Sequence, residues 1–294
     1  MKTLSEEIQL QSEANASLMD FPEAYHLAKQ SWINPPQAVK LEHLPMLTGL
    51  IGGLRPQEFT ILCGPTGSGK TSLLAMMSAS MMITRDKHMV ASVETGYEDF
   101  ARRVVSVILD RDLNTGERVS PEVFAEIESN YGFLISADDL ILSRVDNRMS
   151  LDFLMAKLKA AVARGCKVAL MDNLNFFMDV TKSSETIIEM DRVIHEIIMF
   201  CKTNPIHIVM VMHPKKTDGG RITSEFDIKG SSTAVQEAHN VMLFNRVTQE
   251  MLTSGFKDTH REIKIVKLRR NGRAVGKTVI IDGASPRYLE CEIR

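Results

Sequence analysis

The sequence of 294 residues has no long apolar run and no signal for export. Its most apolar stretch, Leu73–Ile83, is too short to span a bilayer and is interrupted by serines. The first residues, Met1–Glu7, lack the apolar core of a signal peptide and are too acidic for a transit peptide. These absences predict a cytoplasmic protein that does not enter a membrane.

Metal-ligand spacing, repeats and an excess of one charge are missing as well. The four cysteines show no CxxC pattern, which indicates reduced thiols in a cytosolic-type compartment. A formal net charge of −2 argues against a wholly basic surface, so any nucleic acid must be contacted through local basic patches. With 44% hydrophobic and 24% charged residues, the composition is that of an ordinary soluble globular protein.

What the sequence does contain is a complete phosphate-binding loop. Its residues are Gly64, Pro65, Thr66, Gly67, Ser68, Gly69, Lys70 and Thr71. Glycines let backbone N–H groups approach a polyphosphate, and a helix that begins directly afterwards turns its positive end toward the anion. We expect Lys70 to reach the β and γ phosphates and the Thr71 hydroxyl to hold Mg²⁺. The loop predicts a nucleotide-binding protein.

Apolar runs and helical periodicity alternate from residue 50 onward, which predicts a doubly wound, mostly parallel α/β sheet flanked by helices. Few helices separate the last strands, so we expect an antiparallel extension at one edge. Expected strands are 58–63, 88–93, 140–145, 167–172, 206–212, 240–244, 262–268 and 276–281, and expected helices are 70–84, 97–109, 121–129, 150–164 and 184–203.

The chain divides into an N-terminal arm, residues 1–44, and a globular domain, residues 45–294. One or two short amphipathic helices are expected in the arm before Pro35 and Pro36, which exclude helix. Folding back on its own domain and docking on a neighbouring subunit are equally open for this arm.

Two acidic residues end apolar strands and can complete a hydrolytic site. Asp172 has the place of a carboxylate that orders Mg²⁺, although an aspartate that caps the following loop is the alternative. Glu94 can polarise a water in line with the γ phosphate as general base, and a plain surface glutamate is its alternative. Together with the loop they predict nucleoside-triphosphate hydrolysis.

Further polar residues suggest what the hydrolysis drives. His213 follows an apolar strand, where it can sense the γ phosphate, or it is simply a histidine at a strand end. The basic segment Pro214–Arg221 has the charge for phosphate contacts with a nucleic acid; a solvated loop is the alternative. The cation-rich run Arg261–Arg273 is either a solvated face or a strand that delivers an arginine finger to an adjacent subunit.

Taken together, these residues resemble the motor domain of DnaB-type ring helicases, most closely that of Twinkle and phage primase-helicases. The resemblance covers roughly residues 45–290 and rests on six features in order: Gly64–Thr71, Ser92–Thr95, Met171–Met178, Val211–Lys216, Lys229–Ser232 with Gln236–Val241, and Lys267–Arg269. It implies a RecA-like fold, ATP or another NTP or dNTP bound with Mg²⁺ between subunits of a hexamer, and single-stranded DNA in the central pore.

The resemblance also implies roles for particular residues. Lys267 and Arg269 match a lysine and an arginine finger that act on the neighbouring subunit, with Arg270 as a rival finger. Arg246 matches a position against the nucleotide base. Residues in the DNA-binding loops are Lys215, Lys216, Arg221, Lys229, Gly230, Ser231 and Ser232.

The forty-odd residues before the motor leave no space for a primase, so we expect no priming activity and a loader or primase in trans. The leading interpretation is a hexameric 5′–3′ DNA helicase or translocase. The alternatives are a RecA-like clamp or filament whose ATP turnover regulates binding without unwinding, and an accessory subunit of a phage or defence complex. A strand-displacement assay on forked DNA separates unwinding from binding alone.

Overall fold

The computed structural model describes residues 4–16, 18–92, 94–115, 119–143, 150–173, 185–215, 221–228 and 232–291. The chain forms two compact units, Met1–Gln37 and Ala38–Arg294. Within the first unit lie helices α1 (Leu4–Ala16) and α2 (Phe21–Ile33). The Asp20 carboxylate accepts a hydrogen bond from the Glu23 backbone N–H at 2.9 Å, which satisfies a donor of the first turn of α2.

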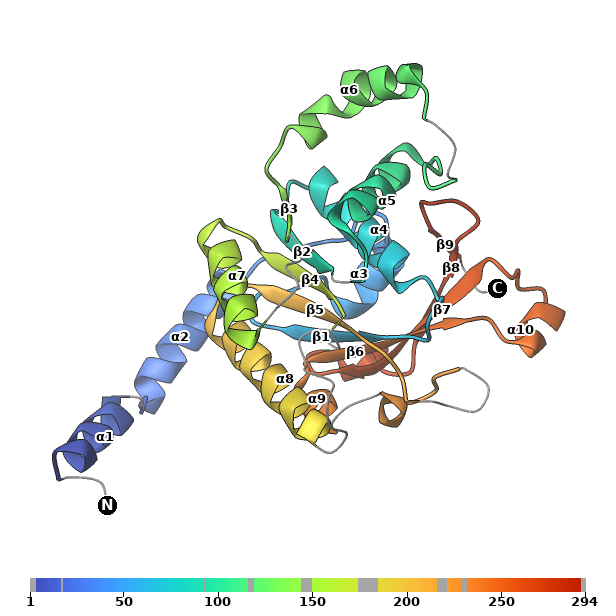
Figure 1. Ribbon diagram of the computed structural model, residues 1–294. Helices are drawn as coiled ribbons and strands as arrows, with labels where there is room; N and C mark the ends of the chain where they lie inside the picture. Colours follow the sequence, from blue (N-terminus) through green and yellow to red (C-terminus); the bar gives the residue numbers. More distant parts are fainter. Residues whose placement is uncertain are drawn as a thin grey trace. The chain divides into compact units, whose positions relative to one another are not determined.

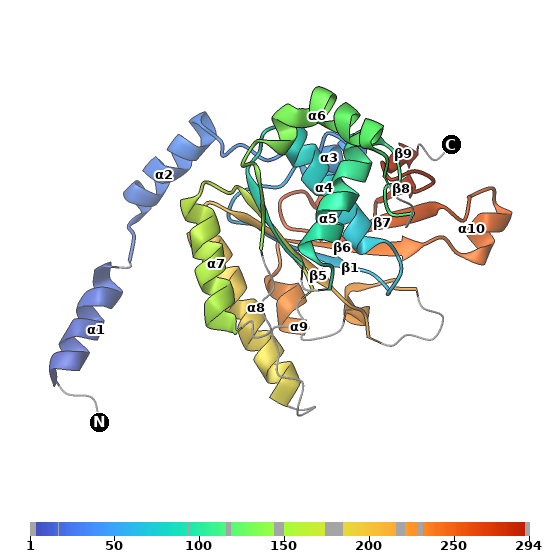
Figure 2. The ribbon, with the colours of Figure 1, turned by 45° about the horizontal axis from the view of Figure 1, so that its top comes forward.

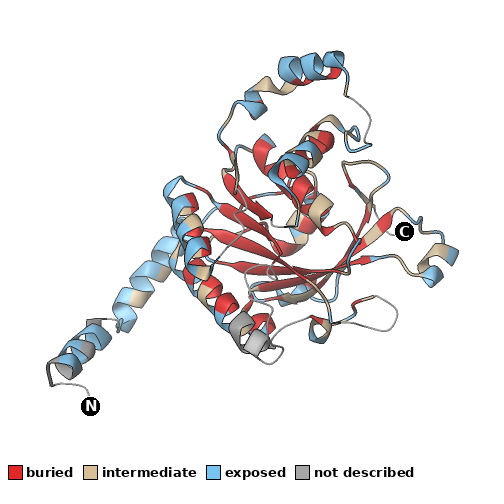
Figure 3. Cartoon of the chain, in the orientation of Figure 1, coloured by how far each residue is buried: buried red, intermediate tan, exposed pale blue. Residues whose placement is uncertain are grey.

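Helix α2 buries none of its residues (Figure 3). Large apolar side chains are nevertheless frequent on it, and Tyr25 and Trp32 pack edge to face with ring centroids 6.2 Å apart. The exposed apolar residues on and beside α2 are Leu18, Met19, Phe21, Tyr25, Leu27, Trp32 and Ile33. They form an unusually apolar exposed surface for a single helix.

The second unit is built on one sheet, whose described strands follow the order β3-β2-β4-β5-β1-β6-β7-β8-β9 (Figure 1). Neighbouring strands from β3 to β6 are parallel, whereas β6 to β9 pair antiparallel. The strands are β1 (Phe59–Cys63), β2 (His88–Ser92), β3 (Leu140–Leu142), β4 (Val168–Asp172), β5 (His207–Met212), β6 (Asn240–Arg246), β7 (His260–Leu268), β8 (Thr278–Asp282) and β9 (Leu289–Cys291). This confirms the predicted doubly wound sheet with an antiparallel extension.

Helices cover both faces of the sheet (Figure 2). One hydrophobic cluster joins helices α3, α4 and α5 to strand residues such as Leu62 and Val90, and a second joins α7, α8 and α9 to their neighbours Ile61 and Met89. Alternate residues of each central strand therefore face opposite cores. The helices are α3 (Pro45–Ile51), α4 (Lys70–Ile83), α5 (Tyr97–Leu109), α6 (Pro121–Ile135), α7 (Leu151–Ala163), α8 (Glu185–Thr203), α9 (Ser232–Glu237) and α10 (Gln249–Thr253), with short 3₁₀ helices η2 (Glu225–Asp227) and η3 (Gly272–Ala274).

The predicted elements differ from the structure mainly at their ends. The helix expected over 121–129 continues to Ile135, because Leu134 is buried and extends its apolar face. Strand β3 ends at Leu142. Strand β9 and helices α3, α9 and α10 were not predicted, because segments of three to seven residues carry too little periodicity. No helix in the described ranges is long and apolar enough to cross a membrane.

Residues 38–44, which the sequence assigned to the arm, belong to the second unit. Val39 and Leu54 exchange two backbone hydrogen bonds of 2.8 Å, and the side chains of Leu41 and Leu44 are fully buried. Helix α3 follows without a side-chain cap of its own. The Glu290 carboxylate of β9 instead accepts from the backbone N–H groups of Met46 and Leu47, at 2.5 and 2.8 Å.

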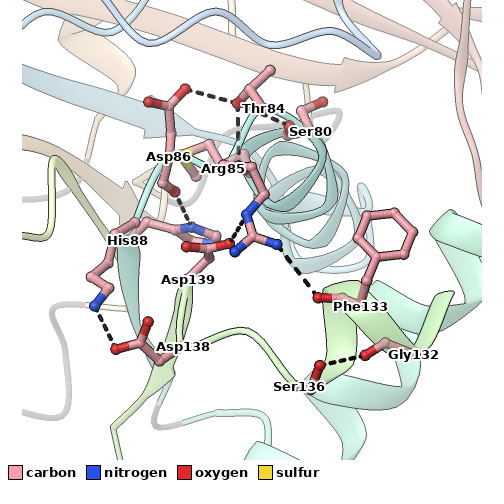
Figure 4. Close-up of polar contacts among 12 residues, drawn as sticks. Ser80, Thr84, Arg85, Asp86, His88, Gly132, Phe133, Ser136, Asp138 and Asp139 are labelled. Atoms are coloured by element: carbon pink, nitrogen blue, oxygen red, sulfur yellow. Dashed lines mark hydrogen bonds and ion pairs between the residues drawn. The ribbon is translucent and has the colours of Figure 1, made fainter.

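A polar cluster at the amino end of β2 ties α4, α6 and β3 together (Figure 4). The Arg85 guanidinium pairs with Asp139 at 2.7 Å and donates to the Phe133 carbonyl of α6 at 3.4 Å. Asp86 accepts from the Thr84 hydroxyl at 2.7 Å and pairs with Lys167 at 2.6 Å. These contacts hold the amino ends of the strands in place.

Candidate functional site

The phosphate-binding loop joins β1 to α4 in a backbone shape that only glycine accommodates at several positions. Gly67 and Gly69 have φ values of 74° and 99°, in the left-handed region. A Cβ on Gly64 would lie 2.5 Å from the Phe244 carbonyl oxygen, too close to be tolerated. The loop therefore curls tightly over the start of α4, whose unpaired N–H groups face it.

Lys70 and Thr71 begin α4 and point into this loop. The Lys70 ammonium donates to the carbonyls of Gly64 and Pro65, at 2.8 Å each, and burial lowers the pKa of Lys70. The Thr71 hydroxyl donates to Oδ2 of Asp172 at 2.8 Å. Burial raises the pKa of Asp172, opposed in part by this hydrogen bond. The structure thus brings the loop and the end of β4 together.

These residues fit a magnesium ion. Oδ1 of Asp172 is buried and has no hydrogen-bond partner within the described part of the chain, while Oδ2 meets the Thr71 hydroxyl. A buried carboxylate oxygen without a partner is costly unless a ligand completes it, and oxygen atoms are the ligands that Mg²⁺ prefers. Asp172 and Thr71 are therefore the residues that would hold the ion.

Glu94 and His213 meet at the same end of the sheet through Asn173. The Asn173 side-chain amide donates to Oε2 of Glu94 at 3.3 Å and contacts Nε2 of His213 at 2.7 Å. Glu94 and His213 themselves are 3.9 Å apart, and the Glu94 side chain is 47% exposed. A pocket of about 190 Å³ places both beside the loop and Lys70.

Two further residues of this site, Asn173 and Arg103, were not predicted from the sequence. Asn173 follows Asp172 directly, but its link between Glu94 and His213 depends on the neighbouring positions of β2, β4 and β5. Arg103 of α5 lines the pocket as well; its Nη1 donates to the Ser72 hydroxyl at 3.4 Å, and its buried Nε has no hydrogen-bond partner among the described residues. The sequence feature that could have indicated Arg103 is its position nine residues after Glu94, on the helix expected over 97–109.

Arg246 lies against the loop, and a larger cleft opens beside it. Its guanidinium donates to the Gly67 carbonyl, with Nη2 at 2.6 Å. The cleft has a volume of about 530 Å³ and is lined in part by Pro65, Arg221 and Arg246. A space of this size next to a phosphate loop has room for the base and sugar of a nucleotide.

The predicted DNA-binding residues are only partly described. Lys216, Lys229, Gly230 and Ser231 lie outside the described residues, and Ser232 is the first residue of α9. Lys215 donates to the Phe226 carbonyl at 2.8 Å. Arg221 forms an ion pair of 2.5 Å with Glu262, whose side chain is 9% exposed. Arg221 is thereby turned toward the nucleotide cleft.

The finger candidates lie at the opposite end of the sheet from the loop. The Arg269 backbone N–H donates to the His239 carbonyl, and the His239 N–H donates to the carbonyl of Phe59, the first residue of β1. The loop begins only after Cys63, the last residue of β1. Five residues of strand separate these levels by roughly 16 Å. Arg269 therefore lies too far away to reach the nucleotide of its own chain.

Lys267 and Arg269 both rest on the last carbonyls of α9. Lys267 donates to Val235 and Gln236, and Arg269 donates to Gln236, all at 2.7 Å. Burial and the neighbouring Arg269 lower the pKa of Lys267. Arg270 points elsewhere and pairs with Glu58 at 2.7 Å. Lys267 and Arg269 thus share the carbonyls of α9, Arg270 is held separately by Glu58, and none of the three contacts the loop among the described residues.

Comparison with known proteins connects both ends of this sheet to one family. A family model for the DnaB-like helicase C-terminal domain matches residues 42–288. The chain belongs to this family. Membership implies nucleoside-triphosphatase activity of the kind that uses nucleotide with Mg²⁺, and a replicative helicase at the level of the family.

Solved structures support the RecA-like fold. The chain is similar to a DnaB-like replicative helicase whose interactions with primase were studied, with a TM-score of 0.74 and 14% identity over 99% of this chain and 73% of that one. It is also similar to a solved ATPase domain, with a TM-score of 0.73 and 12% identity over 94% and 100% of the two chains. A KaiC-like protein from Pyrococcus horikoshii OT3 shares the fold at a TM-score of 0.60 and 15% identity, over 88% and 100%.

Proposed function

We propose that this DnaB-family chain is an NTP-driven, ring-forming helicase or translocase of the replicative type that acts on single-stranded DNA. The observation that carries the proposal is the division of one sheet. Loop, Mg²⁺ ligands and general base gather at its carboxyl end, whereas Lys267 and Arg269 lie at its amino end, roughly 16 Å of strand away. Each chain thus contributes one part of the active site at its own loop and a different part of the active site of a neighbouring chain.

Hydrolysis follows from the carboxyl-end residues. Glu94 takes a proton from the attacking water, whose oxygen bonds to the γ phosphorus while the bond to the β–γ bridging oxygen breaks. Lys70 exchanges its two loop carbonyls for the β and γ phosphates, and Thr71 and Asp172 would hold Mg²⁺. When bound, the ion neutralises charge that develops on the phosphoryl oxygens.

Arg269 of a neighbouring chain completes the site, with Lys267 beside it. Both side chains rest on carbonyl oxygens, contacts that a triphosphate can replace with stronger charge-assisted bonds. Arg246 lies where it can contact the base, beside the 530 Å³ cleft. The nucleotide is ATP or another NTP or dNTP.

Coupling to DNA runs through His213 and the segment that follows it. The Asn173 amide contacts Glu94 and His213, so a change at the γ phosphate can reach Lys215 directly along the chain. We assign the contacts with the phosphates of the single-stranded DNA to Lys215, Lys216, Lys229 and Gly230–Ser232. Arg221 is held by Glu262 and is therefore assigned to the nucleotide side.

Assembly into a hexamer would use the apolar surface of α2. An exposed helix with Phe21, Tyr25 and Trp32 on it gains stability when it packs against a second copy of this chain. A loader or a primase in trans is the further partner that we propose. Within the family, the six sequence features still favour the helicase domain of Twinkle and phage primase-helicases, and the sequence favours the cytoplasm.

Arg269→Ala tests the shared site. Nucleotide affinity should remain nearly unchanged, because the finger belongs to another chain's site, while turnover falls by about 10³-fold or more. Hydrolysis rate and nucleotide binding are measured on the same preparation. Undiminished hydrolysis would remove Arg269 from the role.

Strand displacement on forked DNA tests the motor itself. A helicase displaces the strand at protein concentrations that support rings, and only with hydrolysable nucleotide. DNA-stimulated hydrolysis without displacement would favour the alternative, a RecA-like clamp or filament that binds DNA under ATP control.

A further inference from the structure

An ion pair anchors the residue next to the proposed finger. Nε of Arg270 lies 2.7 Å from Oε1 of Glu58, the residue directly before β1. The Glu58 side chain is 7% exposed, whereas that of Arg270 is 61% exposed. The second carboxylate oxygen of Glu58 accepts from the Asn240 amide at 3.4 Å. Glu58 is therefore a buried carboxylate that pairs with a surface arginine.

The backbone of the same segment is fixed from the other side. The Arg269 N–H donates to the His239 carbonyl at 3.0 Å, and the His239 ring nitrogen Nδ1 accepts from the Phe59 N–H at 3.1 Å. Burial, together with the nearby Arg269, lowers the pKa of His239 to about 4, so the ring stays neutral and can accept. Main chain and side chain thus tie residues 269 and 270 to the start of β1.

Arg269 itself is exposed between these two anchors. Its guanidinium donates to the Gln236 carbonyl at 2.7 Å, at the end of the short helix α9. A finger must be presented to another chain with its Cα and direction already set, because positioning contributes much of its effect. The anchors supply this while the side chain stays accessible.

We propose that Glu58 is a positioning residue for the finger: its ion pair with Arg270 sets the backbone from which Arg269 reaches the nucleotide of the neighbouring chain. This rests on the proposed function. Strand β1 then has two tasks, since it carries Glu58 before its first residue and the phosphate loop after its last. The finger offered to one site is anchored on the strand that holds the nucleotide of another.

Glu58→Gln tests the inference without opening a cavity. A misplacement of about 1 Å can cost 10²-fold in rate, so kcat for ATP should fall by between about tenfold and 10²-fold. KM should stay within about twofold, because the finger acts in the transition state. A kcat equal to that of the wild-type chain would overturn the inference.

Asp86→Asn is the matched control. Asp86 also precedes a strand, is 15% exposed and pairs with the 57% exposed Lys167 at 2.6 Å, a contact at the far side of the sheet from the finger segment. Loss of the Asp86–Lys167 ion pair should lower the free energy of unfolding by about as much as Glu58→Gln does, and it should leave kcat unchanged. Equal losses of kcat in both variants would assign the effect to general destabilisation and overturn the inference.

Substitutions at Arg270 separate anchor from finger. Arg270→Ala should reproduce the kcat of Glu58→Gln, and Arg270→Lys, which can restore the ion pair, should return most of the rate. Arg269→Ala should be the more damaging by at least about tenfold, since a finger is worth 10³-fold or more. Full loss with Arg270→Ala and little with Arg269→Ala would make Arg270 the finger and overturn the inference.

Mixed assemblies decide whether Glu58 acts across the interface. A Lys70→Ala chain has no working loop but an intact finger, so mixing it with Glu58→Gln chains should raise DNA-independent hydrolysis per Glu58→Gln chain severalfold. Arg269→Ala mixed with Lys70→Ala is the reference. If the reference mixture shows no recovery of hydrolysis, the shared site is overturned, and this inference is overturned with it. If the reference mixture recovers hydrolysis and the Glu58→Gln mixture does not, the shared site stands and the positioning role of Glu58 is overturned.

Discussion

Buried polar groups differ in their contacts between the amino end and the carboxyl end of the sheet. At the amino end, buried His88 and His207 have hydrogen-bond partners on both ring nitrogens, and the carboxylates of Asp139 and Glu58 are in ion pairs. At the carboxyl end, Oδ1 of Asp172 and the Ser68 hydroxyl are buried without a partner among the described residues. Oε1 of Glu58 and Oδ2 of Asp139 have ion pairs but no hydrogen bond, whereas Oδ1 of Asp172 has neither kind of contact among the described residues. Hydrogen-bonded and ion-paired groups fix the strands, and the buried oxygen without either contact is available to a ligand.

Of the changes that probe this contrast between the two ends, the largest effect is expected at the carboxyl end, from Glu94→Gln. The amide cannot take a proton from water, so kcat should fall by about 10²- to 10⁴-fold while nucleotide binding persists. Steady-state hydrolysis and binding of a nonhydrolysable analogue measure the two. Glu98→Gln, on the exposed first turn of α5, is the control. If Glu94→Gln kept the wild-type kcat, the general base would lie elsewhere.

An intermediate effect is expected at the amino end, from pH. Burial lowers the pKa of His207 to about 4, from an ordinary value of 6.5. Between these values the unfolded chain binds a proton that the folded chain does not, so stability is full above pH 6.5 and falls as the pH drops toward 4. The loss is about 3 kcal/mol for this histidine, or about 1.4 kcal/mol per pH unit.

Urea denaturation of the wild-type chain and of His207→Gln, measured across this pH range, checks the expectation. Glutamine can keep the hydrogen bond to Thr60 but does not titrate, so the slope of unfolding free energy against pH should become shallower. His88 has its pKa lowered to about 4 as well, so part of the slope remains. An unchanged slope would show that the His207 site is not closed to protons.

The smallest effect is expected at the edge of the sheet, where β9 caps α3. Glu290→Ala removes the acceptor for two N–H groups of its first turn and should cost about 1 kcal/mol of unfolding free energy, with hydrolysis unchanged. Thermal and urea unfolding measure it against Glu250→Ala on the exposed helix α10. An equal effect of the two substitutions would contradict the capping role.

Local signals made much of this site predictable. The loop Gly64–Thr71 carries its own backbone requirements, and apolar strands located Glu94 and Asp172 at one edge. Pairing across the sheet was not predictable in the same way. Asn173 joins Glu94 to His213 only because β2, β4 and β5 are neighbours, and Arg221 meets Glu262 forty-one residues away. A basic loop pattern alone assigned Arg221 to DNA, and its pairing with Glu262 and its place in the lining of the cleft beside Arg246 gave no signal in the sequence.

The sequence also left the finger open between Arg269 and Arg270. Both are cations that follow the same strand, and only their contacts in the folded chain distinguish them. Arg270 is held by the buried Glu58, while Arg269 rests on a carbonyl of α9. Glu58 itself gave no signal, because its partner lies 212 residues further along the chain.

An electron-microscopy structure with a nonhydrolysable ATP analogue, Mg²⁺ and a single-stranded oligonucleotide tests the shared site most directly. We expect a closed ring with the oligonucleotide in its pore. In it, the Arg269 guanidinium of one chain contacts the γ phosphate held by Lys70 of the next, while Arg270 stays on Glu58. Arg269 still bound to the Gln236 carbonyl, with the γ phosphate contacted only by residues of the chain that binds it, would contradict a site shared between chains.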